Sequence, residues 1–331
     1  MALVPATDPT PPRVSIIIPL HRDGEQFRKC LAQYWHMSSL ATFEIVIVTD
    51  GSVEGLPDEV LHVQTGSPVD TSPAVKRDCG AKFARGVIFA YIDDDAYPSP
   101  LWLDAALETL QHTGAAGVGG PGITPPDSGW RERLGGAVYE SRIGTGPLRH
   151  RFLALHPHRP MDDVPAYNFV VQRTAIEAVG GWDSTFYGGE DTKICLSLIK
   201  AGYRLVYSPR VIVYHYRRPV LQAHLRQIAN IGRHRGFFVR RYPETSLRAV
   251  YFLPSLGVAA ILPSLVIGAL YAYRAPYRLL ALIIFTWSAL ALPAAGRAGL
   301  SASLFPPVLV LHHAAYGINF VKGLLGKNLT R

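Results

Sequence analysis

Three consecutive carboxylates, Asp93, Asp94 and Asp95, directly follow the apolar run at residues 87–92. Adjacent carboxylates repel one another, and at the end of a buried strand this repulsion is costly unless a cation lies between them. The cluster therefore indicates a divalent-metal site that holds a phosphate group. A solvated turn, in which an aspartate caps the helix expected from Pro100, is the alternative interpretation.

A second acidic pair, Glu190 and Asp191, follows two glycines and opens a predicted helix that carries Ile194 and Leu198 on one face. The positive end of the helix dipole keeps a carboxylate at this position ionised. An ionised Asp191 could accept a proton from an incoming hydroxyl group, which is the role of a general base. Simple capping of the helix is the alternative interpretation.

Short apolar runs predict the strands that must position these acids. They occupy residues 14–19, 43–48, 87–92, 167–171, 203–207 and 211–215. Because helical patterns alternate with the runs, the sequence predicts an α/β fold with an open, doubly wound, mostly parallel sheet. Ligands bind beyond the carboxyl ends of such strands, where Asp50 and the three carboxylates would lie. His215 ends the last run and is a candidate metal ligand, although a lone histidine is more often structural.

Two further elements are expected around this sheet. The pattern over residues 78–86 predicts a helix with Phe83 facing inward. Residues 127–163 are basic and are expected to be irregular and to contain a mobile loop over the site.

The last third of the chain is strongly apolar. Residues 249–273 carry no charge, and two further apolar stretches follow at 279–296 and 300–321, separated by short loops with Arg274, Arg278 and Arg297. Such stretches are long enough to cross a bilayer, so residues 249–331 are predicted to form a membrane region with two or three helices. A buried helical hairpin of a soluble domain is the alternative.

The number of crossings stays open. Three crossings would place Lys322, Lys327 and Arg331 outside, against the tendency of basic residues to stay on the cytoplasmic side. Two crossings and one interfacial or re-entrant segment would keep them inside.

The positive charge of the chain, +8 at neutral pH, is concentrated before the first apolar stretch. Residues 217–248 contain eight arginines and one acid, Glu244. Nucleic acid could explain such a run, but its position beside a bilayer segment favours anionic lipid headgroups or a lipid phosphate, so no nucleic-acid partner is expected.

The N-terminus and the cysteines indicate the compartment. Residues 1–13 are rich in proline, carry no signal-peptide pattern and are expected to be a flexible lead-in. The three cysteines are widely spaced, which fits a reducing compartment. We therefore expect a main domain over residues 14–216 in the cytosol, a basic juxtamembrane segment over 217–248, and the membrane region after it.

Taken together, these residues resemble family 2 glycosyltransferases, which are inverting enzymes of GT-A fold that use nucleotide-diphosphate sugars. The motifs that carry the resemblance lie, in chain order, at residues 14–19, 49–52, 76–80, 91–95, 180–183, 189–191 and 213–215. Each motif alone is weak, and their common order makes the resemblance specific. Two positions depart from the family pattern: Thr49 stands where an acid or asparagine is common, and Asp78 stands where asparagine is usual.

The resemblance implies a role for each matching residue. The nucleotide sugar, with a UDP sugar favoured, would be bound by Pro19, Asp50, Arg77, Asp93, Asp94 and Glu190. Mn²⁺ or Mg²⁺ would be held by Asp93 and Asp95, with His215 as a further ligand. Asp191 would be the catalytic base.

The C-terminal stretch at residues 311–323 resembles the tail of membrane-bound family 2 enzymes that build bacterial exopolysaccharides on lipid carriers. This implies a hexosyltransferase at the inner membrane, with a cytoplasmic catalytic domain and a lipid-linked acceptor. The candidate contacts for the acceptor phosphate are Arg233, Arg235, Arg240 and Arg241.

The sequence is compatible to different degrees with three other functions. A polyprenyl-phosphate glycosyltransferase, which charges the lipid carrier directly, fits the same residues. A non-catalytic, membrane-anchored protein that binds nucleotide sugars is less favoured because Asp191 is present. A processive synthase is disfavoured because no QxxRW-type motif follows His215.

Overall fold

The computed structural model describes residues 3–5, 8–184, 186, 188–271, 278 and 303–329. The chain divides into two compact units, which we call the sheet unit (Met1–Ile123 and Leu153–His215) and the helical unit (Thr124–Phe152 and Tyr216–Arg331). The expected domain over residues 14–216 therefore differs at one segment, because residues 124–152 group with the C-terminal part of the chain.

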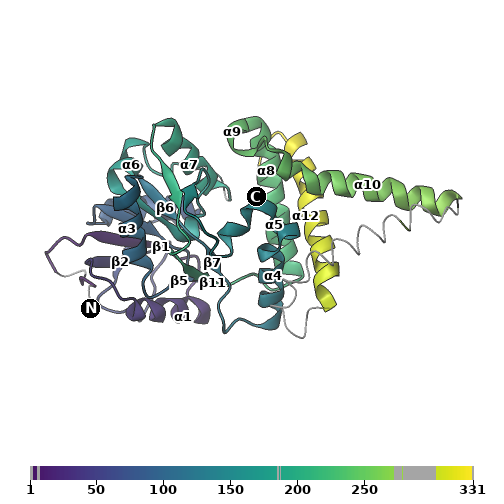
Figure 1. Cartoon of the computed structure of the whole chain (residues 1–331). Coiled ribbons are helices and arrows are strands. Elements are labelled where there is room, and N and C mark those ends of the chain that lie inside the picture. Colours follow the sequence, from purple (N-terminus) through teal and green to yellow (C-terminus); the bar gives the residue numbers. More distant parts are fainter. Residues whose placement is uncertain are drawn as a thin grey trace. The chain divides into compact units, whose positions relative to one another are not determined.

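The sheet unit is built on an eight-stranded sheet with the order β3-β2-β1-β4-β9-β6-β10-β8 (Figure 1). The strands are β1 (Val14–Pro19), β2 (Phe43–Thr49), β3 (Leu61–Gln64), β4 (Ile88–Tyr91), β6 (Gly117–Gly119), β8 (Arg159–Pro160), β9 (Phe169–Gln172) and β10 (Leu205–Tyr207). Strand β9 runs antiparallel to both of its neighbours, and β8 runs antiparallel to β10. The other pairs are parallel, which confirms the predicted α/β fold with a mostly parallel sheet.

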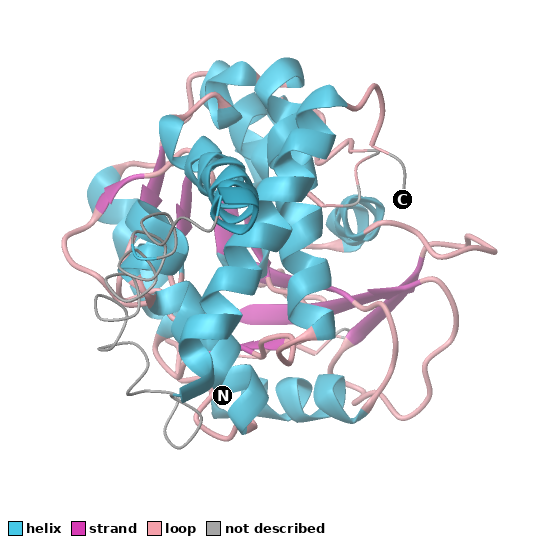
Figure 2. Cartoon of the chain, turned by 90° about the vertical axis from the view of Figure 1, so that its right-hand side faces the viewer, coloured by secondary structure: helices cyan, strands magenta, loops and turns pink. Residues whose placement is uncertain are grey.

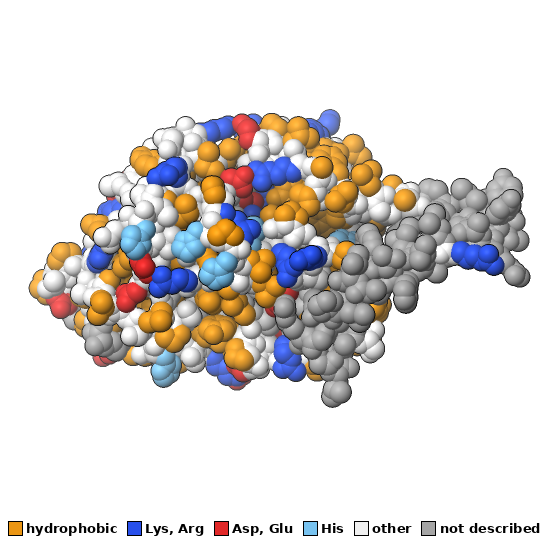
Figure 3. Space-filling view, viewed as in Figure 1, with side chains coloured by type: hydrophobic (Ala, Val, Ile, Leu, Met, Phe, Trp, Pro, Cys, Tyr) orange, Lys and Arg blue, Asp and Glu red, His pale blue; other side chains and the backbone are white. Residues whose placement is uncertain are grey.

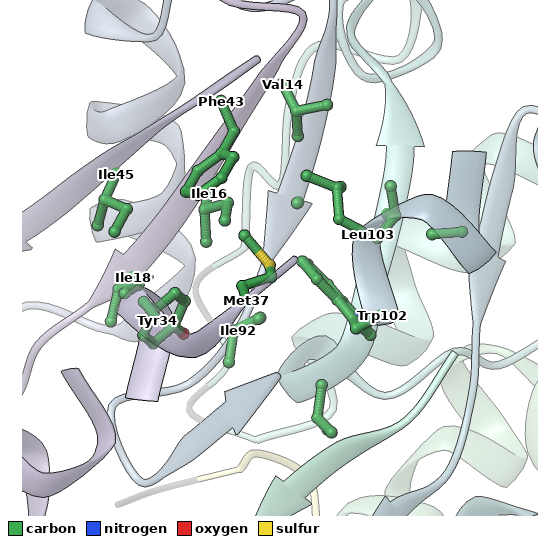
Figure 4. Close-up of a cluster of buried hydrophobic side chains, with 14 of the residues drawn as sticks. Val14, Ile16, Ile18, Tyr34, Met37, Phe43, Ile45, Ile92, Trp102 and Leu103 are labelled. Atoms are coloured by element: carbon green, nitrogen blue, oxygen red, sulfur yellow. The ribbon is translucent and has the colours of Figure 1, made fainter. Parts of the chain in front are cut away.

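Helices cover both faces of this sheet, which explains why its inner strands are continuous apolar runs. Successive side chains of a strand point to opposite faces, so Ile16 and Ile18 of β1 lie in one core and Ile17 lies in the other. The first core contains side chains of α1 (Glu25–Gln33) and α3 (Trp102–Thr113), and Figure 4 shows its centre. The second core contains side chains of α2 (Pro73–Phe83), α6 (Arg173–Ala178) and α7 (Glu190–Lys200).

The expected helix at 78–86 begins earlier and ends earlier than its pattern indicated. Helix α2 starts at Pro73, because the Ser72 hydroxyl accepts a hydrogen bond from the amide of Val75 and proline suits the first helical turn. Phe83, expected to face inward, is 54% exposed at the last position of the helix. That expectation was wrong, because the helix presents its small residues Ala74 and Gly80 to the sheet.

A second sheet of three short strands lies in the same unit, in the order β5-β11-β7. It consists of β5 (Ala96–Pro98), β7 (Gly122–Ile123) and β11 (Val213–His215). Strands β5 and β11 are antiparallel, with His215 opposite Ala96. This register brings the end of the chain segment 211–215 beside the three carboxylates.

The helical unit contains the helices α4 (Trp130–Glu140), α5 (Arg142–Thr145), α8 (Gln222–Arg241), α9 (Pro243–Ser246), α10 (Ala249–Tyr271) and α12 (Phe305–Leu325), which Figure 1 labels. Figure 2 shows the chain from a second side, with its helices in cyan. The expectation of an irregular loop over residues 127–163 was therefore wrong for much of the segment. The buried side chains of Leu134 and Val138 on α4 pack with Phe305 and Leu309 on α12.

The predicted apolar stretches differ in how far the structure describes them. Among the described residues, α12 alone is long and apolar enough to cross a membrane by length and composition, and residues Ala249–Ala260 form a shorter apolar helix. The stretch at 279–296, the start of the stretch at 300–321, and Arg274, Arg297 and Arg331 lie outside the described residues.

Candidate functional site

The predicted site residues of the sheet unit gather at the carboxyl ends of its parallel strands. Pro19 ends β1, Asp50 follows β2, and Asp93 to Asp95 follow β4. The backbone amide of His21 donates a hydrogen bond of 2.8 Å to Oδ2 of Asp94, which ties the segment after β4 to the segment after β1. The strand order β2-β1-β4 therefore brings these residues to one edge, as parallel topology requires.

Asp95 and His215 form a close pair at this edge. Nε2 of His215 lies 3.0 Å from Oδ1 of Asp95, and each side chain is only 12% exposed. The register of β5 and β11 creates the pair, since it places His215 opposite the residue after Asp95. The Tyr167 ring packs on the His215 ring with 4.4 Å between centroids, which fixes the imidazole plane.

Arg77 joins the two acidic segments that the sequence analysis singled out. Its guanidinium group lies 2.6 Å from Oδ1 of Asp93 and 3.3 Å from Oε1 of Glu190. The group also lies over the ring of Trp182, at 4.5 Å from the centroid. Arg77 is 1% exposed, so it is held beneath the site by these three partners. Its place fits the positioning of the carboxylates better than an open contact with a nucleotide base.

The electrostatics of this group are strongly coupled. Burial raises the pKa of Asp93 above its ordinary value, and the neighbouring charge of Asp95 raises it further, while Arg77 opposes both effects. Burial alone would lower the pKa of Arg77, but the carboxylates of Asp93 and Glu190 raise it instead. The site thus concentrates negative charge around one buried cation, and additional positive charge would stabilise it.

Asp191 lies in the first turn of α7, where the chain makes a tight turn through Gly188 and Gly189. Both glycines have positive φ, of 99° and 79°, a conformation that other residues adopt at a cost. Oε2 of Glu190 accepts the amide of Gly188 at 2.8 Å, and Oδ1 of Asp191 accepts the amide of Thr192 at 2.8 Å. The Asp191 charge also interacts with Arg77, which connects it electrostatically to the carboxylates after β4.

Asp50 is held by several donors. Its carboxylate accepts hydrogen bonds from the hydroxyl groups of Thr65 and Thr71 and from the amide of Thr71, and it pairs with Nζ of Lys76 at 2.8 Å. Although burial raises its pKa, Lys76 and the threonines lower it more, so the carboxylate stays charged. These donors occupy most of the acceptor capacity of a carboxylate.

Lys76 and Trp182 are the residues that sequence reasoning missed. Both belong to quoted motifs, yet only their tertiary contacts show what they do. Lys76 is 2% exposed, and a buried ammonium group requires a partner such as Asp50.

The contacts of Asp78 explain why an aspartate can replace the asparagine that is usual in the family at this position. Its two carboxylate oxygens accept the amides of Trp182 and Asp183, at 2.7 Å and 3.0 Å. An asparagine has one acceptor oxygen in its side chain, whereas an aspartate supplies two. Asp78 therefore fixes the segment that carries the Trp182 ring over Arg77.

A divalent cation suits the donor set of this edge. Among the described residues, no three histidine, cysteine or acidic side chains converge as a complete metal centre. Asp95 and His215, however, bring one oxygen and one nitrogen within 3.0 Å of each other, with Asp93 two residues away. Mg²⁺ and similar ions commonly use one or two protein carboxylates together with substrate phosphates, so this partial set fits such an ion.

The four candidate arginines for the acceptor phosphate lie on α8, in the helical unit. Arg235 is buried, with its guanidinium group 5.1 Å from the ring centroid of Tyr251. Arg240 donates to the carbonyl of Leu324 at 3.0 Å. Arg233 is half-buried, whereas Arg240 and Arg241 are exposed, so Arg235 is the one buried member of the set.

Comparison with known proteins identifies the class. The model of the glycosyl transferase family group 2 matches residues 88–321, which cover the segment after β4, α7, β11 and both long helices α8 and α12. The chain belongs to this family and is a glycosyltransferase.

Two relatives show how similar the chain is to known glycosyltransferases. The chain is similar to a pre-mycofactocin glycosyltransferase of Mycobacterium tuberculosis, with 28% identity over 82% of this chain. It spans only 58% of that relative's length. It is also similar to the dolichyl N-acetyl-alpha-D-glucosaminyl phosphate 3-beta-D-2,3-diacetamido-2,3-dideoxy-beta-D-glucuronosyltransferase of Methanococcus voltae, with 24% identity over 96% of this chain and 98% of the relative.

A solved structure shows the same fold. The mannosyltransferase PcManGT of Pyrobaculum calidifontis, determined in complex with GDP-Man and Mn²⁺, superposes with a TM-score of 0.61. The match covers 97% of this chain and 89% of that chain, at 19% sequence identity. The predicted GT-A fold is therefore confirmed.

Proposed function

We propose that this glycosyltransferase is a metal-dependent, inverting enzyme that moves a sugar from a nucleotide-diphosphate donor to a lipid-linked acceptor at a membrane. The observation that carries the proposal is the link made by Arg77. This buried cation binds Asp93 of the acidic segment after β4 and Glu190 at the start of α7, which also carries Asp191. A candidate diphosphate site and a candidate base are thereby held in one rigid array.

Asp95 and His215, with Asp93 beside them, would hold Mn²⁺ or Mg²⁺, and such an ion supplies positive charge to the diphosphate leaving group. The mannosyltransferase of the same fold was solved with Mn²⁺, which agrees with this assignment. Pro19, Asp50 and Asp94 shape the nucleoside side of the site. In this proposal Lys76 and Arg77 keep the carboxylates in place.

Asp191 acts as the general base. It accepts the proton of the acceptor hydroxyl while that oxygen attacks the anomeric carbon and the bond to the diphosphate oxygen breaks. A single displacement of this kind inverts the configuration at the anomeric carbon. Asp191 lies in the first turn of α7, where the positive end of the helix dipole favours a negatively charged carboxylate.

The acceptor assignment rests on the helical unit and on one relative. That relative's name describes transfer to a dolichyl-phosphate-linked sugar, and the match covers nearly its full length. This favours elongation of a lipid-linked sugar over direct charging of a polyprenyl phosphate. Helices α10 and α12 anchor the enzyme at the cytoplasmic face of the inner membrane, and the arginines of α8 meet the lipid phosphate.

A transfer assay tests the proposal. Purified enzyme is incubated with UDP-, GDP- and TDP-sugars, and either a lipid-linked sugar or plain polyprenyl phosphate is added as the acceptor. We expect Mn²⁺-dependent transfer to the lipid-linked sugar from one donor class, with inverted configuration in the product. Transfer to plain polyprenyl phosphate alone would establish the carrier-charging function instead.

A further inference from the structure

Helix α12 has the length and composition of a membrane span, yet it lies along α8 over most of its length (Figures 1 and 2). Near the start of α8, Nε2 of His224 lies 3.1 Å from Nδ1 of His312, which is the eighth residue of α12. Near their ends, Arg240 donates to the carbonyl of Leu324 at 3.0 Å. The two helices therefore run in the same direction, and α8 contacts α12 from residue 312 to residue 324.

Glycines allow the backbones of α8 and α12 to approach closely. A Cβ atom at Gly232 or Gly236 of α8 would collide with the backbone carbonyl of Tyr316 or Phe320 on α12. In the other direction, a Cβ atom at Gly323 would collide with the carbonyl of Arg233. Backbones that approach this closely cannot be separated without loss of the packing, so α8 and α12 must adopt one common orientation relative to any membrane.

The arginines of α8 argue against an orientation in which the helix pair spans the bilayer. Between the two contacts just described, α8 carries Arg226, Arg233 and Arg235. At a rise of about 1.5 Å per residue, residues 224–240 extend over roughly 24 Å, which is most of a hydrocarbon core about 30 Å thick. If α12 spanned the membrane, these three arginines would lie at bilayer depth, where charged side chains are strongly disfavoured.

The face of α12 that is exposed nevertheless carries a row of apolar side chains. Leu304, Leu311, Ile318 and Leu325 recur at intervals of seven residues and are between 43% and 74% exposed. This spacing places them on one side of the helix along its whole length. Figure 3 shows apolar side chains gathered over the helical unit near the start of α10.

The polar side of the pair belongs to α8. Its exposed positions are Gln222, Arg226, Asn230, Arg240 and Arg241, which are polar, and the apolar Ile231. One helix thus offers an apolar face and the other offers a basic one, which is the pattern of helices that lie in the plane of an anionic lipid surface.

We propose that α8 and α12 form an in-plane membrane anchor, with α12 lying in the interface of an anionic bilayer and not crossing it. The inference rests on the membrane location in the proposed function and deepens it. It also selects between the two topologies of the sequence analysis, because an in-plane α12 leaves both of its ends, including Lys322 and Lys327, on the same side.

Cysteine labelling at the two ends of α12 tests the proposal in the full-length enzyme. Ser303→Cys and Asn328→Cys alter exposed positions just before and after the helix. Each is combined with Cys79→Ser, since Cys79 is half-buried whereas Cys30 and Cys195 are buried. In sealed vesicles of phosphatidylglycerol and phosphatidylethanolamine, we expect a membrane-impermeant maleimide to label both positions from the same side.

Labelling from opposite sides, in vesicles that still transfer sugar, would overturn the in-plane anchor and leave the proposed function intact. Recovery of the enzyme in the soluble fraction would contradict both. The two failures are therefore distinguishable.

Depth measurements with nitroxide labels provide a second readout. Leu311→Cys, Ile318→Cys and Leu325→Cys lie on the exposed apolar face, so these changes leave the packing with α8 in place. An in-plane helix predicts similar, shallow depths at all three positions, and Asn230→Cys on α8 serves as the water-exposed control. A depth that is greatest at residue 318 would contradict the proposal, as would spin–spin broadening that shows a second copy on this face.

Discussion

The two units treat buried positive charge differently. In the sheet unit, Lys76 and Arg77 are both almost fully buried and both pair with carboxylates at 2.8 Å or less. In the helical unit, Arg217 and Arg235 are buried against aromatic rings, with the guanidinium of Arg217 5.0 Å from the Phe152 centroid. The helical unit contains four acids, Asp127, Glu132, Glu140 and Glu244, and only the last of them lies in the arginine-rich segment 217–248.

Each unit is therefore suited to a different ligand. The sheet unit balances its cations internally and gathers further carboxylates at the strand ends, which favours a metal ion with its diphosphate. The helical unit keeps an excess of positive charge beside exposed apolar side chains, which favours an anionic lipid surface. The predictions below separate the two kinds of charge.

Removal of the carboxylate at the strand end should have the largest effect. We expect Asp95→Ala to abolish transfer, because it removes the oxygen that lies 3.0 Å from His215 and with it one donor of the candidate metal site. Asp58→Ala, at an exposed position of the same unit, is the control and should retain activity. Full turnover by Asp95→Ala would remove the metal assignment.

Asp191→Asn should lower turnover by a factor on the order of 10² or more, because general-base catalysis typically contributes that much. The amide has nearly the same shape but does not accept the proton. Donor affinity should change little, and steady-state kinetics with varied donor concentration measure both quantities. If the variant lost donor binding and kept its rate, Asp191 would be a helix cap and not a base.

The internal charge balance of the sheet unit predicts a pH-dependent loss of stability. Asp50→Asn should lower the free energy of unfolding by about 2 kcal/mol near neutral pH, since it weakens hydrogen bonds to a charged group and leaves Lys76 buried without its carboxylate. The pKa of Asp50 is lowered in the folded state, so its stabilising effect is present above the unfolded pKa near 4 and is lost as the pH falls towards the folded value.

Denaturant unfolding of both proteins from pH 7 to pH 3 measures this effect. The difference between wild type and Asp50→Asn should stay constant down to about pH 5 and shrink below about pH 4. A difference that grew with acidity would show that the ion pair does not stabilise the fold.

The accessible arginines of α8 should have the smallest effect. Arg233→Gln with Arg241→Gln should raise the KM for a lipid-linked acceptor by roughly fivefold for each residue, since a basic side chain near an anionic surface contributes about 1 kcal/mol. Hydrolysis of the donor by water should change little. Arg235→Gln is the informative contrast, because its buried contact with Tyr251 predicts a loss of stability rather than a change in KM.

If the acceptor KM were unchanged both in detergent and in bilayers, the arginines would not bind the acceptor. Their role would then be to set the orientation of the chain in the membrane. A defect in bilayers alone would assign them to anchoring.

The sequence predicted the parts of the fold whose local pattern and burial agree. Strands β1, β2 and β4 were predicted closely because strands buried on both faces are continuous apolar runs. Helix α4 was missed because Gly135 and Gly136 lower its intrinsic helix propensity, while its stability comes from packing against α12. The course of α12 depends on the distant α8, which no local pattern contains.

The candidate site divides in the same way. The position of the acids at the ends of strands was predicted, because charged residues that follow an apolar run are visible in the sequence. The pairing of His215 with Asp95 follows from the register of β5 and β11, and the burial of Arg77 follows from contacts with Asp93, Glu190 and Trp182. Tertiary structure alone supplies these relations.

Nucleotide binding with and without metal measures the metal dependence of the site by itself, because it requires neither the donor sugar nor the acceptor. UDP and GDP are titrated into the full-length enzyme by calorimetry, once with Mn²⁺ and once with excess EDTA. We expect one nucleotide to bind at least tenfold more tightly with Mn²⁺, and we expect Asp95→Ala to lose this difference. Equal dissociation constants in Mn²⁺ and EDTA for both nucleotides would contradict a metal-dependent site at the end of β4.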